Sequence, residues 1–100
     1  MDMKKMMKEA RKMQAELNRA QEEVSELTAE GSSGGGVVKA TASGAGVLLS
    51  ITIAPEAIDP DDIPMLQDLV LIAVNDALGA ASEEASARLG AVTGGMNLPF

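Results

Sequence analysis

Apolar residues recur with a strict seven-residue period along the first quarter of the chain. Residues 3 to about 27 contain no Gly or Pro and consist mostly of residues that favour helices. One position of the repeat holds Met3, Ala10, Leu17 and Val24, and the other holds Met6, Met13, Ala20 and Leu27. Four consecutive heptads predict a helix with one packing seam. Because such a helix is about 37 Å long, we expect part of it to project from the rest of the domain.

A Gly/Ser-rich segment, residues 28–36 (TAEGSSGGG), interrupts this pattern. Its composition predicts a simple connector, with an irregular edge strand as the alternative. A phosphate-binding loop needs a Gly-Lys-Ser/Thr sequence followed by a helix, whereas Gly36 is followed by Val37 and Val38. We therefore exclude a loop of that kind.

Residues 37–53 have the two-residue period of a β-hairpin. The runs 37–43 and 47–53 are rich in β-branched residues, and Gly44-Ala45-Gly46 lies between them as a three-residue turn. In the second run one face holds Val47, Leu49, Ile51 and Ile53, while Ser50 and Thr52 point the other way. We expect an antiparallel hairpin with this apolar face buried.

A second helix is predicted from about residue 62 to about residue 89, with a tail over 90–100. Asp61 and Asp62 precede it beside Pro60 and Pro64, and we interpret these carboxylates as helix caps rather than metal ligands. The centre of the helix is apolar almost all round, which predicts that it lies in the core. The longest strongly apolar run, residues 69–74, is much shorter than a bilayer span, so we expect no membrane partner.

The composition disfavours an enzyme. The 100 residues contain no His, Cys, Trp or Tyr, which removes the commonest general base, thiol chemistry and the usual zinc ligands. We therefore expect no cofactor, no metal and no disulfide, and a cytoplasmic location. The only aromatic residue is Phe100, so the core must be built from smaller side chains, and help from a partner subunit is expected.

Charge is distributed unevenly along the chain. The net charge is −7, yet residues 1–19 hold six basic and three acidic residues, a net +3, and the remainder holds two basic and twelve acidic residues, a net −10. The six cations avoid the apolar seam and line the opposite side of the first helix: Lys4, Lys5, Lys8, Arg11, Lys12 and Arg19. Such a stripe favours phosphate binding, but it is also typical of an ordinary solvated face. Without an aromatic residue nearby, double-stranded DNA suits it better than a single strand.

Several local sequences, in this order and spacing, resemble the YbaB/EbfC family over nearly the whole chain. They are the Met/Lys/Gln-rich start at residues 6–14, GGGVVKAT at 34–41, MLQDLV at 65–70, VNDA at 74–77 and TGGM at 93–96. The resemblance implies one α+β domain over residues 1–100, with a long N-terminal helix, a small antiparallel sheet and a C-terminal helix. It further implies a homodimer with protruding helices that binds double-stranded DNA, alters its conformation in the nucleoid and influences gene expression.

One region departs from this resemblance. Similar proteins often carry several Lys or Arg at the end of the last helix, whereas residues 79–92 hold only Arg88, beside Glu83 and Glu84. We therefore expect the first helix to supply the DNA contacts. The alternative function is a non-enzymatic adaptor that uses the Met-rich helix and the acidic remainder to bind a partner protein, which the sequence does not identify.

The sequence leaves open what covers the apolar seam. Packing against the second helix of the same chain, pairing with a partner subunit and contact with a lipid surface are all compatible with a Met-rich heptad repeat. The residues concerned are Met6, Ala10, Met13, Leu17, Ala20 and Val24.

Overall fold

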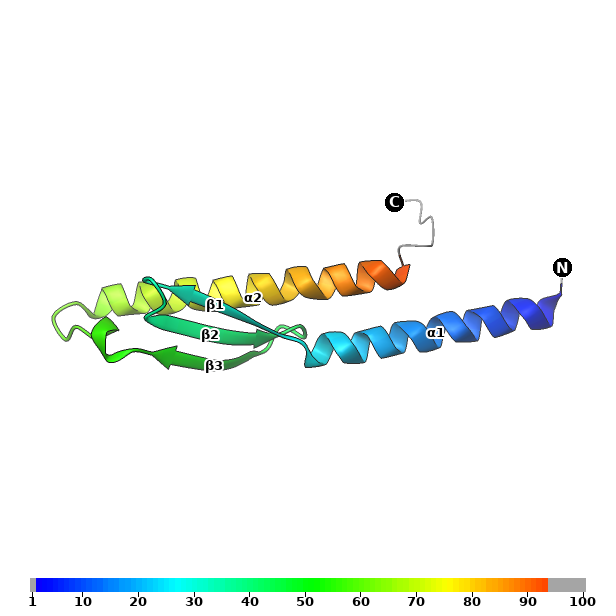
Figure 1. Ribbon diagram of the computed structural model, residues 1–100, viewed down its shortest axis with the longest axis horizontal. Coiled ribbons are helices and arrows are strands. Elements are labelled where there is room, and N and C mark those ends of the chain that lie inside the picture. Colours follow the sequence, from blue (N-terminus) through cyan, green and yellow to red (C-terminus); the bar gives the residue numbers. More distant parts are fainter. Residues whose placement is uncertain (1, 94–100) are drawn as a thin grey trace.

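The computed structural model describes residues 2–93 as two helices joined by a three-stranded antiparallel sheet (Figure 1). Helix α1 spans Met3–Glu26 and helix α2 spans Ile63–Thr93. Strands β1, β2 and β3 span Thr28–Ser33, Val38–Ser43 and Leu48–Ile53, in that order across the sheet, and a short 3₁₀ helix, η1, spans Pro55–Ala57. The predicted α+β class and the predicted order of elements are confirmed.

Helix α1 begins and ends where the sequence predicts. The backbone N–H of Lys4 donates to the carboxylate of Asp2, the N-cap, at 3.1 Å. At the other end Leu27 adopts an extended conformation, which leads the chain directly into β1. The helix therefore passes into the sheet without an intervening loop.

The interpretation of residues 28–36 as a simple connector is wrong for the first six of them. Thr28–Ser33 forms the edge strand β1, paired in register with β2 from Thr28 opposite Ser43 to Ser33 opposite Val38. At Gly31 the strand lies so close to α2 that a side chain does not fit, because an added Cβ would lie 2.2 Å from the backbone N of Ala77. Only the next residues turn, with positive φ at Gly34, Gly35 and Gly36.

Helix α2 packs on β1 and β2 through a stripe of alanines spaced four residues apart. The members of this stripe are all buried: Ala73, Ala77, Ala81 and Ala85. The other sides are open, and Leu71 is 59% and Ile72 55% exposed, so the prediction of a helix lying in the core holds only for one side. By length and composition alone, Ile63–Ala91 is apolar enough to cross a membrane. The alanine stripe instead brings this helix close to a sheet.

The buried hairpin face that the sequence predicts is not buried within the chain. All six residues of β3 are exposed, including Ile51 at 41% and Ile53 at 38%, since α2 covers β1 and β2 and barely reaches β3. An irregularity in the pairing between Thr41 and Ala42 also places Leu48, rather than Leu49, opposite Ala42. The apolar face of β3 is thus left without a cover.

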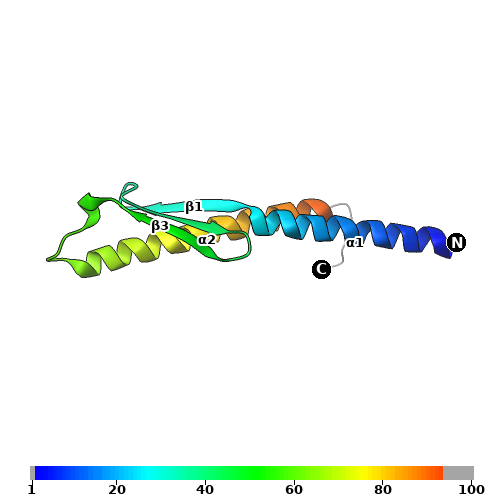
Figure 2. The same ribbon diagram turned by 90° about the horizontal axis from the view of Figure 1, so that it is seen from below.

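The molecule is a rod of 73 × 24 × 16 Å. Its radius of gyration is 19.8 Å, against about 13 Å for a compact chain of this length. Two views show the reason, because the N-terminal half of α1 extends past the end of α2 (Figures 1 and 2). Helix α2 continues to Thr93, so the predicted tail begins too early by four residues, and its remainder lies outside the described residues.

Candidate nucleic-acid interface

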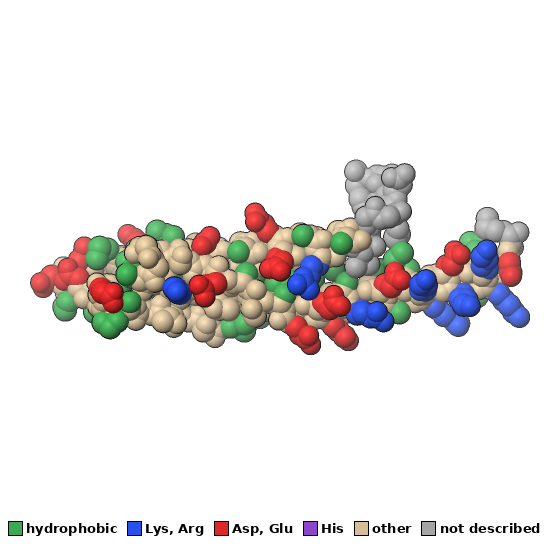
Figure 3. All heavy atoms as spheres, in the orientation of Figure 1, with side chains coloured by type: hydrophobic (Ala, Val, Ile, Leu, Met, Phe, Trp, Pro, Cys, Tyr) green, Lys and Arg blue, Asp and Glu red, His purple; other side chains and the backbone are tan. Residues whose placement is uncertain are grey.

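Five of the six predicted cations lie on the projecting part of α1. We call residues 3–13 the basic arm and residues 14–93 the body. The arm carries Lys4, Lys5, Lys8, Arg11 and Lys12, all exposed, against one acidic residue, Glu9. Figure 3 shows their blue side chains gathered at one end of the rod. No part of the body covers them, because α2 ends beside the stretch of α1 that follows the arm.

The helical repeat brings three of these cations to one side of the arm. Lys4, Lys8 and Arg11 are separated by four and three residues, the spacing of neighbours on a helix surface. Together with Met7 they line a shallow groove of about 300 Å³. Lys5 and Lys12 are spaced by seven residues and follow the neighbouring line of the same helix. The arm therefore presents a row of positive charges along about 12 Å of helix.

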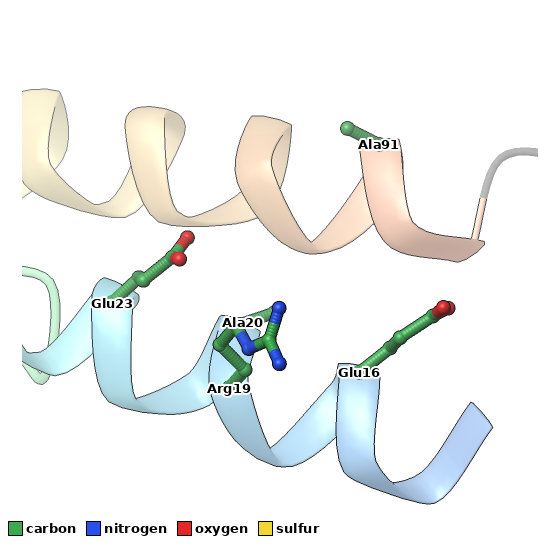
Figure 4. A pocket seen from close by; sticks show the side chains of 5 residues that line it. All are labelled: Glu16, Arg19, Ala20, Glu23 and Ala91. Atoms are coloured by element: carbon green, nitrogen blue, oxygen red, sulfur yellow. The ribbon is translucent and has the colours of Figure 1, made fainter. Parts of the chain in front are cut away.

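Arg19 is not brought together with the other five cations. It lines a separate groove between α1 and α2, with Glu16, Ala20, Glu23 and Ala91. Figure 4 shows its guanidinium on the side that faces α2, between the carboxylates of Glu16 and Glu23. Two neighbouring carboxylates repel a phosphate, so this position is much less suited to DNA than the arm.

The seam residues change their surroundings along α1. Ala20 and Val24 are buried, Met13 and Leu17 are half-buried, and Met6 and Ala10 are exposed. Val24 and Leu27 belong to the core cluster that also contains the alanine stripe of α2. The same heptad pattern thus packs inside the chain at its C-terminal end and is open at Met6 and Ala10 on the basic arm.

The body is acidic, most of all at the end of the rod opposite the basic arm. Glu56, Asp59, Asp61 and Asp62 lie at this tip, where Figure 3 shows red side chains. The predicted capping role is confirmed for Asp62, whose carboxylate accepts the backbone N–H of Met65 at 3.2 Å. Over residues 2–93 no three His, Cys, Asp or Glu side chains are arranged to hold a metal ion.

Besides Arg19, the body holds two cations, Lys39 and Arg88, which stand on different elements. Arg88 is paired with Glu84 at 3.6 Å, with both side chains half-exposed. Lys39 stands on the polar outer face of the sheet, in register with Ser32 and Thr52. The end of α2 therefore has no free positive surface of the kind that the arm presents.

Sequence reasoning missed an uncovered apolar surface on α2 and β3. Leu66, Gln67, Val70, Leu71 and Val74 line an open groove of about 390 Å³ on α2. The exposed apolar side chains of β3 include Leu48, Ile51 and Ile53. The sequence could have predicted this uncovered surface, because a helix that is apolar all round cannot bury every side against one small sheet.

Comparison with known proteins gives consistent results. The model of the YbaB/EbfC DNA-binding family matches residues 1–96. A nucleoid-associated protein of Desulforamulus reducens is 52% identical over 98 residues, covering 98% of this chain and 93% of the relative. One from Caldanaerobacter subterraneus is 50% identical over 94 residues, covering 94% and 85%. The crystal structure of an uncharacterized protein of Helicobacter pylori shares the fold, with a TM-score of 0.69 and 24% identity over 87% of this chain and 91% of that one.

Proposed function

This chain belongs to the YbaB/EbfC DNA-binding family, and we propose that it is a nucleoid-associated protein that binds double-stranded DNA through its basic arm. The observation that carries the assignment to the arm is the separation of charge along the rod. Five exposed cations stand on residues 3–13, beyond the end of α2, and the acidic side chains gather on the body. The family and its relatives indicate DNA binding rather than catalysis, and they give no support to an adaptor role.

Electrostatics explains how a chain of net charge −7 can bind a polyanion. Screening acts over about 8 Å at physiological salt, whereas the rod is 73 Å long. The acidic tip therefore contributes little to the field at the basic arm. Each phosphate that a Lys or Arg neutralises releases condensed counterions, which supplies affinity without sequence preference. DNA should contact the arm and stay away from the body.

The working unit is a homodimer, and three observations support a second copy as the cover for the apolar surface. Among the described residues, eight of the eleven buried apolar side chains are alanine, while Leu, Ile and Met side chains remain exposed. The accessible surface is 7179 Å², against about 5,400 Å² for a compact monomer of 10.3 kDa. The projecting arm accounts for part of this excess, and the uncovered apolar side chains of α2 and β3 account for another part.

Strand β3 supports the same conclusion through its free edge. It has no charge and no Pro in Leu48–Ile53, which are the usual devices that prevent edge strands from pairing. The opposite edge is protected, because the carboxylate of Asp76 accepts the backbone N–H of Ser32 at 3.1 Å. Pairing of β3 with β3 of a second copy, together with burial of the α2 groove, forms a two-fold symmetric interface.

A dimer carries two basic arms, and this gives a route to altered DNA conformation. Each arm neutralises phosphates at a separate point, so the duplex between the two points must follow the spacing that the protein sets. We propose that the protein organises DNA in this way, and that the change in DNA conformation influences gene expression. Its location is then the nucleoid, which lies in the cytoplasm.

The dimer can be tested directly. Light scattering should give twice 10.3 kDa at micromolar concentration. Ile51→Lys should give a monomer.

Titration of the chain onto plain duplex DNA at several salt concentrations tests the proposed function. If four cations of the dimer meet phosphates, log K should fall with log salt at a slope of about −3.6. The double variant Arg11→Glu, Lys12→Glu should bind tenfold to a hundredfold more weakly, about 1.4 to 2.8 kcal/mol, with an unchanged melting curve. Arg88→Ala is the control and should bind like the wild type. Full affinity in the double variant would move the site off the arm, and a slope near zero would favour the adaptor.

A further inference from the structure

Met7 stands apart from the other apolar residues of α1. It is 53% exposed, and the heptad repeat assigns the seam to Met6, one residue earlier. Met7 therefore lies on the flank of the seam, next to the cationic side of the basic arm. An exposed methionine gains nothing for the fold at this position, because the body does not reach the arm.

The surroundings of Met7 are cationic. Lys4 lies three residues before it and Arg11 four residues after it, so the two charges flank it along the helix at about 4.5 and 6 Å of rise. Lys8 completes the groove of about 300 Å³ that these four side chains line. The arm thus has an apolar side chain at the edge of its cationic side.

This arrangement matches the surface of a DNA major groove. The groove is about 12 Å wide and admits one α-helix, with phosphates on both rims and base edges on its floor. Around the helix, Lys4, Lys8 and Arg11 all stand on the same side of Met7, so when Met7 faces the floor these cations reach the phosphates of one rim. The apolar group on that floor is the C5-methyl of thymine. Methionine is unbranched and polarizable, so it adapts to an apolar surface without a fixed shape.

We propose that Met7 makes the apolar contact of the DNA interface by packing against thymine methyl groups in the major groove, beside phosphates that Lys4 and Arg11 hold on one rim. The inference rests on the proposed function. It assigns to Met7 a part of the DNA affinity that does not depend on counterion release. Binding is then favoured on A·T-rich duplexes. The preference is modest, since one flexible side chain makes it.

Duplexes that differ only in the thymine methyl group test this contact. Affinity is measured on an A·T-rich duplex and on the same duplex with deoxyuridine in place of thymidine. The wild-type chain should bind the deoxyuridine duplex about fourfold more weakly than the thymidine duplex. This factor corresponds to the loss of one buried methyl group, at about 0.8 kcal/mol. Met7→Gln should bind both duplexes equally, with the salt slope of the wild type. Met7→Leu should keep the preference.

Two controls separate this inference from the proposed function. Met6→Gln changes a methionine of nearly equal exposure, 52%, on the seam side and should keep the preference for thymine. Lys8→Gln should lower the salt slope and also keep the preference. Loss of the preference in Met6→Gln, its survival in Met7→Gln, or dissociation of the dimer by Met7→Gln would overturn the inference and leave electrostatic binding intact. If the wild-type chain bound neither duplex, the proposed function would be overturned as well.

Discussion

Helix α1 lies half in the basic arm and half in the body, and these two regions are stabilised differently. In the body, Val24 is 8% exposed and joins the core cluster with the alanines of α2, and Gly31 lies against the backbone of Ala77. In the arm, the seam is open and the helix depends on its N-cap and on helix-favouring residues. Substitutions in the body should therefore act on folding, and those in the arm on binding.

Gly31→Ala should have the largest effect. The added Cβ would lie 2.2 Å from the backbone N of Ala77 and 2.5 Å from the backbone O of Ala73, and a backbone cannot rotate away as a side chain can. We expect a loss of about 3 kcal/mol or more in the free energy of unfolding, measured by urea denaturation. A loss under about 1 kcal/mol would show that β1 does not pack closely on α2.

Val24→Asp and Met6→Asp place the same charge at the two ends of one seam. Val24→Asp buries a carboxylate without a partner and should cost about 2 to 3 kcal/mol of stability. Met6 is 52% exposed, so Met6→Asp should change stability by less than about 0.5 kcal/mol. Thermal melting curves compare the two variants. Equal destabilisation would mean that a second copy covers the seam on the arm.

Lys12→Ala and Arg19→Ala compare two cations at the same heptad position. Lys12 stands on the open arm, whereas Arg19 lines the groove with Glu16 and Glu23. Lys12→Ala should weaken DNA binding severalfold and reduce the salt slope by about 0.9 for each phosphate that is no longer neutralised. Arg19→Ala should change affinity by less than about twofold, or 0.4 kcal/mol. Equal losses in the two titrations would extend the interface into the body.

Gly79→Ala should have a small effect, and it should stabilise the protein. Gly79 lies within α2, and an added Cβ would meet no atom within 4 Å. Replacing a helical Gly by Ala should raise the free energy of unfolding by about 0.5 to 1 kcal/mol. The variant is also the control for Gly31→Ala, because it makes the same change without the clash. A decrease in stability would place a second copy against this side of α2.

The residue pattern alone was enough to predict both helices, the hairpin, the cationic side of α1 and the cap at Asp62, because these depend on local periodicity and on neighbouring residues. Strand β1 was predicted mainly as a connector, since its small residues make sense only when Gly31 is seen against Ala77. Only the tertiary structure separated Arg19 from the other cations, because the end of α2 reaches Arg19 and stops short of the arm. It also decided which apolar side chains are buried, because the width of one helix covers two strands and leaves β3 open.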